Sequence, residues 1–159
     1  MKKIAAMLFL LVFTLLPLSA AAYEYQGPEA ELISLINKKR EQAGAPPLTI
    51  DWEVARLARY KSEEMKNHGL FDHESLIYGN PAQLLERFHI QFAKVGANIA
   101  MGQETPQEVL NAWSSSDGHM SNLTNTSFTS AGAGLARSEE GIYFWTLMLV
   151  STQYHPPQA

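Results

Sequence analysis

The sequence of 159 residues contains no cysteine. This absence excludes a disulfide-stabilised scaffold and any mechanism that uses a thiol nucleophile. The chain also lacks an excess of positive charge, because 12 Lys and Arg stand against 16 Asp and Glu, for a formal net charge of −4. Affinity for nucleic acid depends on cations that neutralise phosphates. We therefore expect no nucleic-acid partner.

Several common catalytic motifs are missing as well. The chain has no Gly-x-Ser-x-Gly elbow and no Walker phosphate loop. His73 is followed by Glu74, but no second histidine completes a His-Glu-x-x-His motif. The segment Gly132–Gly134 lacks the third glycine of a dinucleotide-binding loop. These absences argue against a serine hydrolase, a metalloprotease of that type and a nucleotide-binding protein.

What is present is the composition of one globular domain, with 46% hydrophobic and 18% charged residues. Residues 1–22 differ from the rest: Lys2 and Lys3 precede an apolar run over 4–16, and small residues follow up to Ala22. This pattern is typical of a secretory signal peptide, and the run is shorter than the ~20 residues that span a bilayer. We expect cleavage after Ala22, secretion of the remaining chain without a transmembrane anchor, and a short leader over 23–27.

Hydrophobic periodicity of about 3.6 residues predicts helices in the first two thirds of the chain. They cover 29–43, 51–67, a segment starting at Pro81 and a segment starting at Pro106. Candidate caps support these limits, with Asp51, Asn80 and Thr105 at helix starts and Gly69 beyond one end. After residue 129 the pattern changes to two strands, 132–136 and 141–150, the second apolar on both faces. Helices on both sides of a small sheet form an α-β-α sandwich.

Two of the five histidines, His73 and His119, lie in short polar segments that we expect to be loops. The other three have simpler interpretations: His68 and His89 end helices, and His155 lies in a C-terminal tail over 155–159. Because both rings can titrate near neutral pH, His73 and His119 are candidates for a metal site or for a general acid–base pair.

Separated motifs then agree, in unbroken order, with one protein family. They are 35–40 with Gly44, Phe71-Asp-His73, Gly96-Ala-Asn-Ile-Ala100, Trp113–Ser116 with Gly118-His119 and Asn122-Leu123, and Phe128-Thr129 with Gly132–Gly134. Together they resemble the CAP superfamily (cysteine-rich secretory proteins, antigen 5 and pathogenesis-related proteins), specifically its cysteine-free bacterial branch of SCP-like extracellular domains. The resemblance covers 28–154 and implies an α/β fold, a three-layer α-β-α sandwich with a small central, mainly antiparallel sheet.

The resemblance also implies a cleft with two histidines and two glutamates, which in some members binds zinc or another divalent cation. By motif match the histidines are His73 and His119. Both glutamates are replaced, one by Ala97 and the other at about Ser116. Two histidines without those carboxylates make a poor zinc site, so we expect at most a weak or pH-dependent divalent ion. Glu74 and Asp117, next to the histidines in sequence, could compensate.

We expect the binding residues to be His73, Glu74, Asn98, Ser116, Asp117 and His119, with Trp113, Asn98 and Asn122 supporting the scaffold. We also expect Arg40 to be held by a carboxylate, because a buried guanidinium needs a partner.

The function that follows is a secreted, non-enzymatic module that binds an extracellular lipid, cell-wall component or protein at this cleft. Loss of the carboxylate at Ala97 favours this hypothesis, because binding tolerates that loss better than acid–base chemistry does. The alternative is a metal-assisted hydrolase, such as a peptidase, in which a histidine-bound ion activates water.

Overall fold

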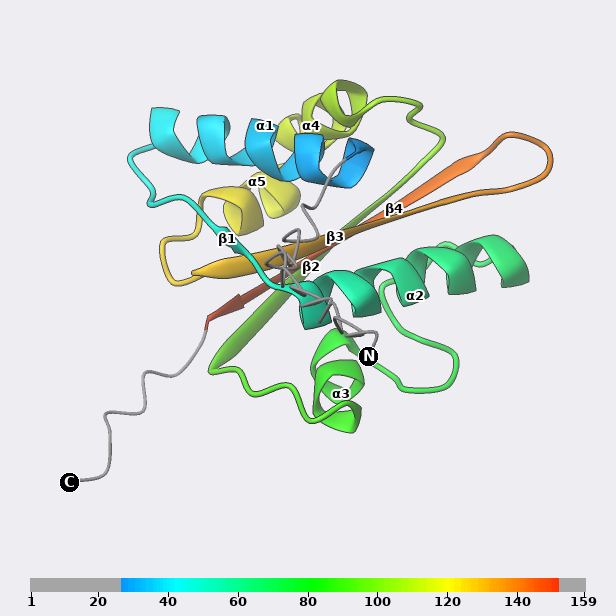
Figure 1. The fold of residues 1–159 in the computed structure, drawn as a ribbon. Helices are drawn as coiled ribbons and strands as arrows, with labels where there is room; N and C mark the ends of the chain where they lie inside the picture. The colour runs from blue at the N-terminus through cyan, green and yellow to red at the C-terminus, as the bar shows by residue number, and fades with distance from the viewer. Residues whose placement is uncertain (1–26, 152–159) are drawn as a thin grey trace, which may run out of the picture.

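The computed structural model describes residues 27–151 and shows a sheet between two layers of helices (Figure 1). One layer contains α1 (Pro28–Gln42), α4 (Pro106–Ser114) and α5 (Asp117–Thr124), and the other contains α2 (Trp52–His68) and α3 (Pro81–Arg87). The predicted three-layer α-β-α class is confirmed. The expected signal peptide over 1–22 and the tail over 155–159 lie outside the described residues.

Within residues 27–151 the sheet has four strands, in the order β1-β3-β4-β2. Their bounds are Thr49–Ile50 for β1, Lys94–Met101 for β2, Ser130–Arg137 for β3 and Tyr143–Ser151 for β4. Only β1 and β3 run parallel, and the other pairs are antiparallel. β4 lies inside the sheet and is buried along almost its whole length, as its two apolar faces predict. The two predicted strands are confirmed, with Gly141 in the turn between them, while periodicity missed β1 and β2.

Helix ends follow the capping signals of the sequence. The Asp51 side chain accepts hydrogen bonds from two backbone N–H groups in the first turn of α2. Asn80 and Thr105 each form a capping box at the start of α3 and α4, which satisfies N–H groups that would otherwise lack partners. Gly69 ends α2 at a φ of 62°, in the left-handed region that glycine adopts without strain.

The backbone of α2 lies directly against the backbone of β3. A Cβ atom added at Gly132 would lie 2.1 Å from the backbone nitrogen of Ala55, and one added at Gly134 would lie 2.2 Å from the carbonyl carbon of Ala58. Both alanines are buried. Only a strand that lacks side chains at these two points allows so close a contact.

A buried hydroxyl pair strengthens the same contact. Ser62 Oγ lies 3.0 Å from the carbonyl oxygen of Gly134, to which it donates, and 2.9 Å from Thr146 Oγ1. Ser62 and Thr146 are both fully buried. These bonds satisfy the hydroxyls inside the core and fix α2 along the direction of the strands.

Arg40 is fully buried, but the prediction that a carboxylate holds it is wrong. Its guanidinium donates to four backbone carbonyls instead, at 2.7 Å to Pro46, 2.7 Å to Leu123, 3.0 Å to Asn125 and 3.2 Å to Phe128. Carbonyls near a helix C-terminus carry partial negative charge and lack partners within the helix, so they suit a cation. Arg40 thereby joins α1 to the C-terminal end of α5.

We predict that Gly132→Ala lowers the free energy of unfolding by about 3 kcal/mol, because the new methyl group would overlap the backbone of α2. Gly118→Ala is the matched control. Its Cβ meets nothing within 4 Å in α5, so stability should stay level or rise by up to about 1 kcal/mol. Urea unfolding of the three proteins measures both effects. An unchanged unfolding midpoint for Gly132→Ala would show that α2 and β3 do not pack this closely.

Candidate functional site

His73 lies in the segment between α2 and α3, where the sequence predicts a loop, and its side chain is exposed. The preceding Asp72 turns the chain, since its Oδ1 accepts a hydrogen bond from the backbone nitrogen of Glu74 at 3.0 Å. Glu74 is exposed as well. The loop therefore presents an imidazole and a carboxylate to solvent from the layer that contains α2 and α3.

His119 lies in the first turn of α5, so the prediction of a loop for this residue is wrong. Ser116 is the N-cap residue of that helix and Asp117 its first residue, although the serine side chain makes no capping bond. Gly118, a poor helix former, hides the start of the helix from sequence inspection. Asp117 is exposed, whereas Ser116 and His119 are half-buried.

Two hydrogen-bonded asparagines, of which Asn98 is buried, attach His119 to the sheet. Asn98 is fully buried on β2, and its Nδ2 donates to the backbone carbonyl of His119 at 3.2 Å. Asn122 Nδ2 donates to Asn98 Oδ1 at 2.9 Å and to the carbonyl of Ala97 at 3.3 Å. Asn98 thus acts on the site through the backbone of His119, and the expected scaffold role of Asn98 and Asn122 is confirmed.

The ring of Trp113 forms one wall of the His119 position. Its centroid lies 6.4 Å from that of the His119 imidazole, at an interplanar angle of 51°. Trp113 is buried, and its indole N–H donates to the carbonyl of Ile99 on β2 at 2.9 Å. Within the part of the chain that the structure describes, His119 Nδ1 is buried and has no hydrogen-bond partner. The Nδ1 edge of this ring is therefore closed to a ligand from solvent.

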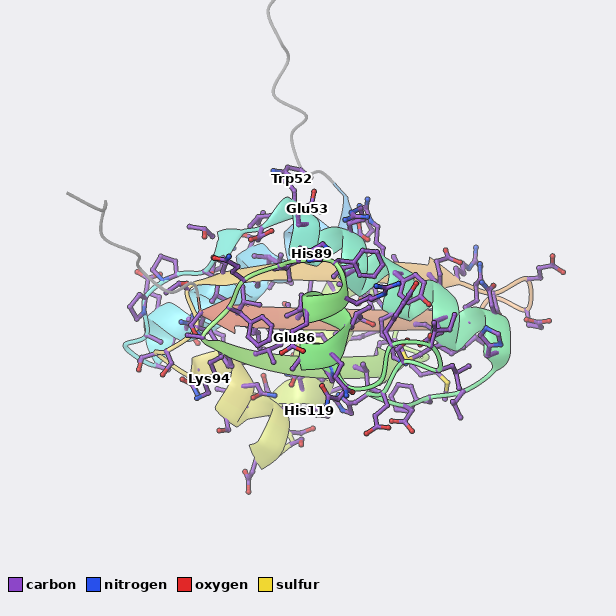
Figure 2. All side chains as sticks on the ribbon, turned by 90° about the horizontal axis from the view of Figure 1, so that it is seen from below. Trp52, Glu53, Glu86, His89, Lys94 and His119 are labelled. Carbon is purple, nitrogen blue, oxygen red and sulfur yellow. The ribbon has the colours of Figure 1, made fainter. Side chains whose placement is uncertain are left out.

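The two histidines come from opposite helical layers yet interact with each other. Partial burial lowers the pKa of His73, the charge of His119 lowers it further, and Lys61 adds to that effect. The carboxylate of Asp72 acts in the opposite direction. Figure 2, which views the molecule from the side of α2 and α3, shows His119 beyond the edge strand β2. The lowered pKa therefore favours the neutral form of the His73 ring.

Comparison with known proteins gives a family for this arrangement. Residues 33–149 match the CAP family, described as the cysteine-rich secretory protein family. The chain belongs to the CAP family. It is 39% identical over 134 residues to the uncharacterised protein YkwD of Bacillus subtilis, a match that covers 84% of this chain and 49% of YkwD. The chain therefore spans about half the length of that curated relative.

Solved structures show the same fold. An extracellular protein of Bacillus anthracis that contains an SCP domain is 29% identical with a TM-score of 0.72, over 79% of this chain and 41% of that one. An outer surface protein of Borrelia burgdorferi is 22% identical with a TM-score of 0.73, over 78% of this chain and 92% of that one. The expected membership in the bacterial, cysteine-free branch of the CAP family is confirmed. No helix within 27–151 is both long and apolar enough to cross a membrane.

The residues of this CAP domain do not fit a tightly bound metal ion. Val95 and Ile99 lie on β2 two residues before and after Ala97, and both belong to apolar clusters that include side chains of α2. Because side chains alternate along a strand, the methyl group of Ala97 also points toward the layer of α2 and α3. A methyl group offers no ligand where the family pattern has a carboxylate. Over residues 27–151 no group of three or more His, Asp and Glu side chains could hold a metal ion. Two imidazoles fall short of the three protein ligands that catalytic zinc sites use.

Sequence analysis missed a buried ion pair next to His73. Lys61 and Glu64 lie one turn apart on α2, and their side chains are 2% and 4% exposed. Burial acts to raise the pKa of Glu64, but hydrogen bonds from Lys61 and Ser75 outweigh it, so the pKa lies below its usual value. One signal was available, since Lys61 and Glu64 are next in sequence to Ser62 and Met65, which face the sheet.

We predict that His119→Ala raises the pKa of His73, because it removes a charge that disfavours protonation of that ring. Asp72→Asn should lower the same pKa, because the carboxylate favours the charged ring. His68→Ala, at the end of α2, should leave it unchanged. NMR titration of the His73 ring protons measures all three variants. An unchanged pKa in His119→Ala would mean that the two rings do not interact.

Proposed function

We propose that this CAP domain is a secreted, non-enzymatic binding module whose ligand contacts the surface around His73 and His119. What supports it most is that the charge of His119 lowers the pKa of His73 although the two rings come from opposite helical layers, and that Ala97 stands where the family pattern has a carboxylate. A neutral imidazole offers one hydrogen-bond donor and one acceptor. Such a pair suits recognition of a polar group on a ligand.

The same geometry favours binding over catalysis. A histidine that acts as a general base is oriented by a group that bonds its other ring nitrogen. His119 Nδ1 has no such partner within the described chain. His73 is exposed, and the neighbouring Asp72 carboxylate accepts a bond from the backbone instead. The pair therefore lacks the fixed orientation that proton transfer requires.

Extracellular location rests on two observations. Residues 1–22 have the pattern of a secretory signal peptide. Among similar structures, one is described as an extracellular protein and another as an outer surface protein. The ligand is then a lipid or sterol, a cell-wall component or a protein partner outside the cell.

The first test compares zinc binding by wild type, Ala97→Glu and Ala97→Glu/His119→Ala. We expect weak binding by wild type and an affinity at least about ten-fold higher for Ala97→Glu, because a carboxylate joins the two imidazoles. The added His119→Ala should abolish the gain. Ala93→Glu, an exposed position just before β2, is the control for added charge. Isothermal titration calorimetry gives the affinities.

Sub-micromolar zinc binding by wild type, lost in His119→Ala, would contradict the proposal. It would instead support the metal-assisted hydrolase, which peptidase assays of the zinc-loaded protein could then examine.

The second test measures ligand binding with two defined probes, purified peptidoglycan sacculi and phosphatidylcholine–cholesterol vesicles. We expect His73→Ala/His119→Ala to reduce sedimentation with the probe that binds by about ten-fold, a loss typical of removing central polar contacts. His68→Ala should bind as wild type does. Binding that survives loss of both histidines would place the ligand elsewhere on the domain.

A further inference from the structure

The buried pair of Lys61 and Glu64 makes its main contacts outside its own helix. Lys61 Nζ lies 2.9 Å from Glu64 Oε2 and also donates to the backbone carbonyl of Glu74. Glu64 Oε1 accepts from Ser75 Oγ at 2.7 Å and from the backbone nitrogen of Leu76 at 3.1 Å. Both members of the pair therefore bind residues 74–76, directly after His73.

The bound segment is itself a closed turn. Ser75 and Gly79 exchange backbone hydrogen bonds of 2.6 and 3.1 Å. Ser75 Oγ also accepts from the backbone nitrogens of Ile77 and Tyr78, at 3.3 and 3.2 Å. A single serine thus links the Glu64 carboxylate to the turn. Any shift of Ser75 relative to α2 would break bonds on both sides of its hydroxyl.

Apolar burial does not hold the His73 side of this loop in place. Residues 69–74 are all exposed, and Leu76 and Ile77 are 55% and 70% exposed. The far end has an apolar anchor, because the ring of Tyr78 lies 5.4 Å from that of Phe88. The near end, which contains His73, has the contacts to Lys61 and Glu64 in place of such an anchor.

A buried ion pair is a costly way to gain stability, since desolvation of both charges offsets their attraction. Its well-attested use is to select one geometry. We propose that Lys61 and Glu64 are positioning residues that fix the backbone at 74–76 and thereby set where the adjacent His73 lies on the surface. The importance of this role for ligand recognition rests on the proposed function, but the role itself does not.

The test replaces the pair by apolar residues of similar size in Lys61→Met/Glu64→Leu, a change that often leaves stability unimpaired. The matched control is Glu63→Gln/Lys66→Gln, which removes another ion pair of the same spacing on the same helix, where the side chains are 48% and 26% exposed. Ser75→Ala is a second variant that keeps the pair and removes only its link to the turn. It keeps the test decisive if the double variant does not fold.

Two measurements need no ligand: amide hydrogen exchange at Leu76, and the ring-proton chemical shifts of His73 and His119 at a pH well above the ordinary histidine pKa. We expect exchange at Leu76 to accelerate at least about ten-fold in Lys61→Met/Glu64→Leu, because its amide loses the Glu64 carboxylate as acceptor. The acceleration should be smaller in Ser75→Ala, which keeps Glu64 and removes only the neighbouring Ser75 hydroxyl. Exchange in the centre of β4 should stay slow. The His73 resonances should move in both variants and stay in place in the control.

Unchanged His73 resonances in folded Lys61→Met/Glu64→Leu, or in Ser75→Ala if the double variant is unfolded, would overturn the proposal and leave the pair a purely structural feature. This outcome is distinct from failure of the proposed function. That failure would show as ligand binding by His73→Ala/His119→Ala, whatever the loop does.

Discussion

Direct contact between the backbones of α2 and β3 is the constraint on which the rest of this domain depends. The absence of side chains at Gly132 and Gly134 lets the helix rest on the strand, and the Ser62 hydroxyl fixes it lengthwise. With α2 immobile, Lys61 and Glu64 are held at a set distance from the sheet. The segment that contains His73 is bonded to those two side chains, so packing in the core determines where an exposed imidazole lies.

The second imidazole is held from the opposite layer by polar contacts to its backbone and by the ring of Trp113 beside it. Asn98 bonds the backbone of His119 to β2, and the guanidinium of Arg40 bonds the end of α5 to α1. Buried polar groups of this kind are stable only when their partners are all in place, which makes them precise anchors. In the sheet formed by residues 27–151, β2 is an edge strand, so no described strand lies beyond it between the two helical layers.

Sequence patterns predicted the features that depend on neighbours in the chain, including the caps at Asp51 and Thr105 and the strands β3 and β4. They failed where distant segments decide the outcome. The alternation of β2 is obscured by buried Asn98, whose partners come from α5, and β1 has only two residues. The prediction of a carboxylate partner for Arg40 failed because the backbone carbonyls that surround it come together only in the folded chain. The two histidines could be chosen from motifs, but the buried charges beneath one of them could not.

The central claim is that His73 and His119 face one shared, solvent-accessible space at the β2 edge of the sheet. A crystal structure of the protein, grown without added divalent cations, tests it most directly. The account predicts both rings bordering the same solvent region, with the Asn98 amide bonded to the His119 carbonyl. Packed side chains between the rings, or rings on opposite faces of the domain, would contradict it.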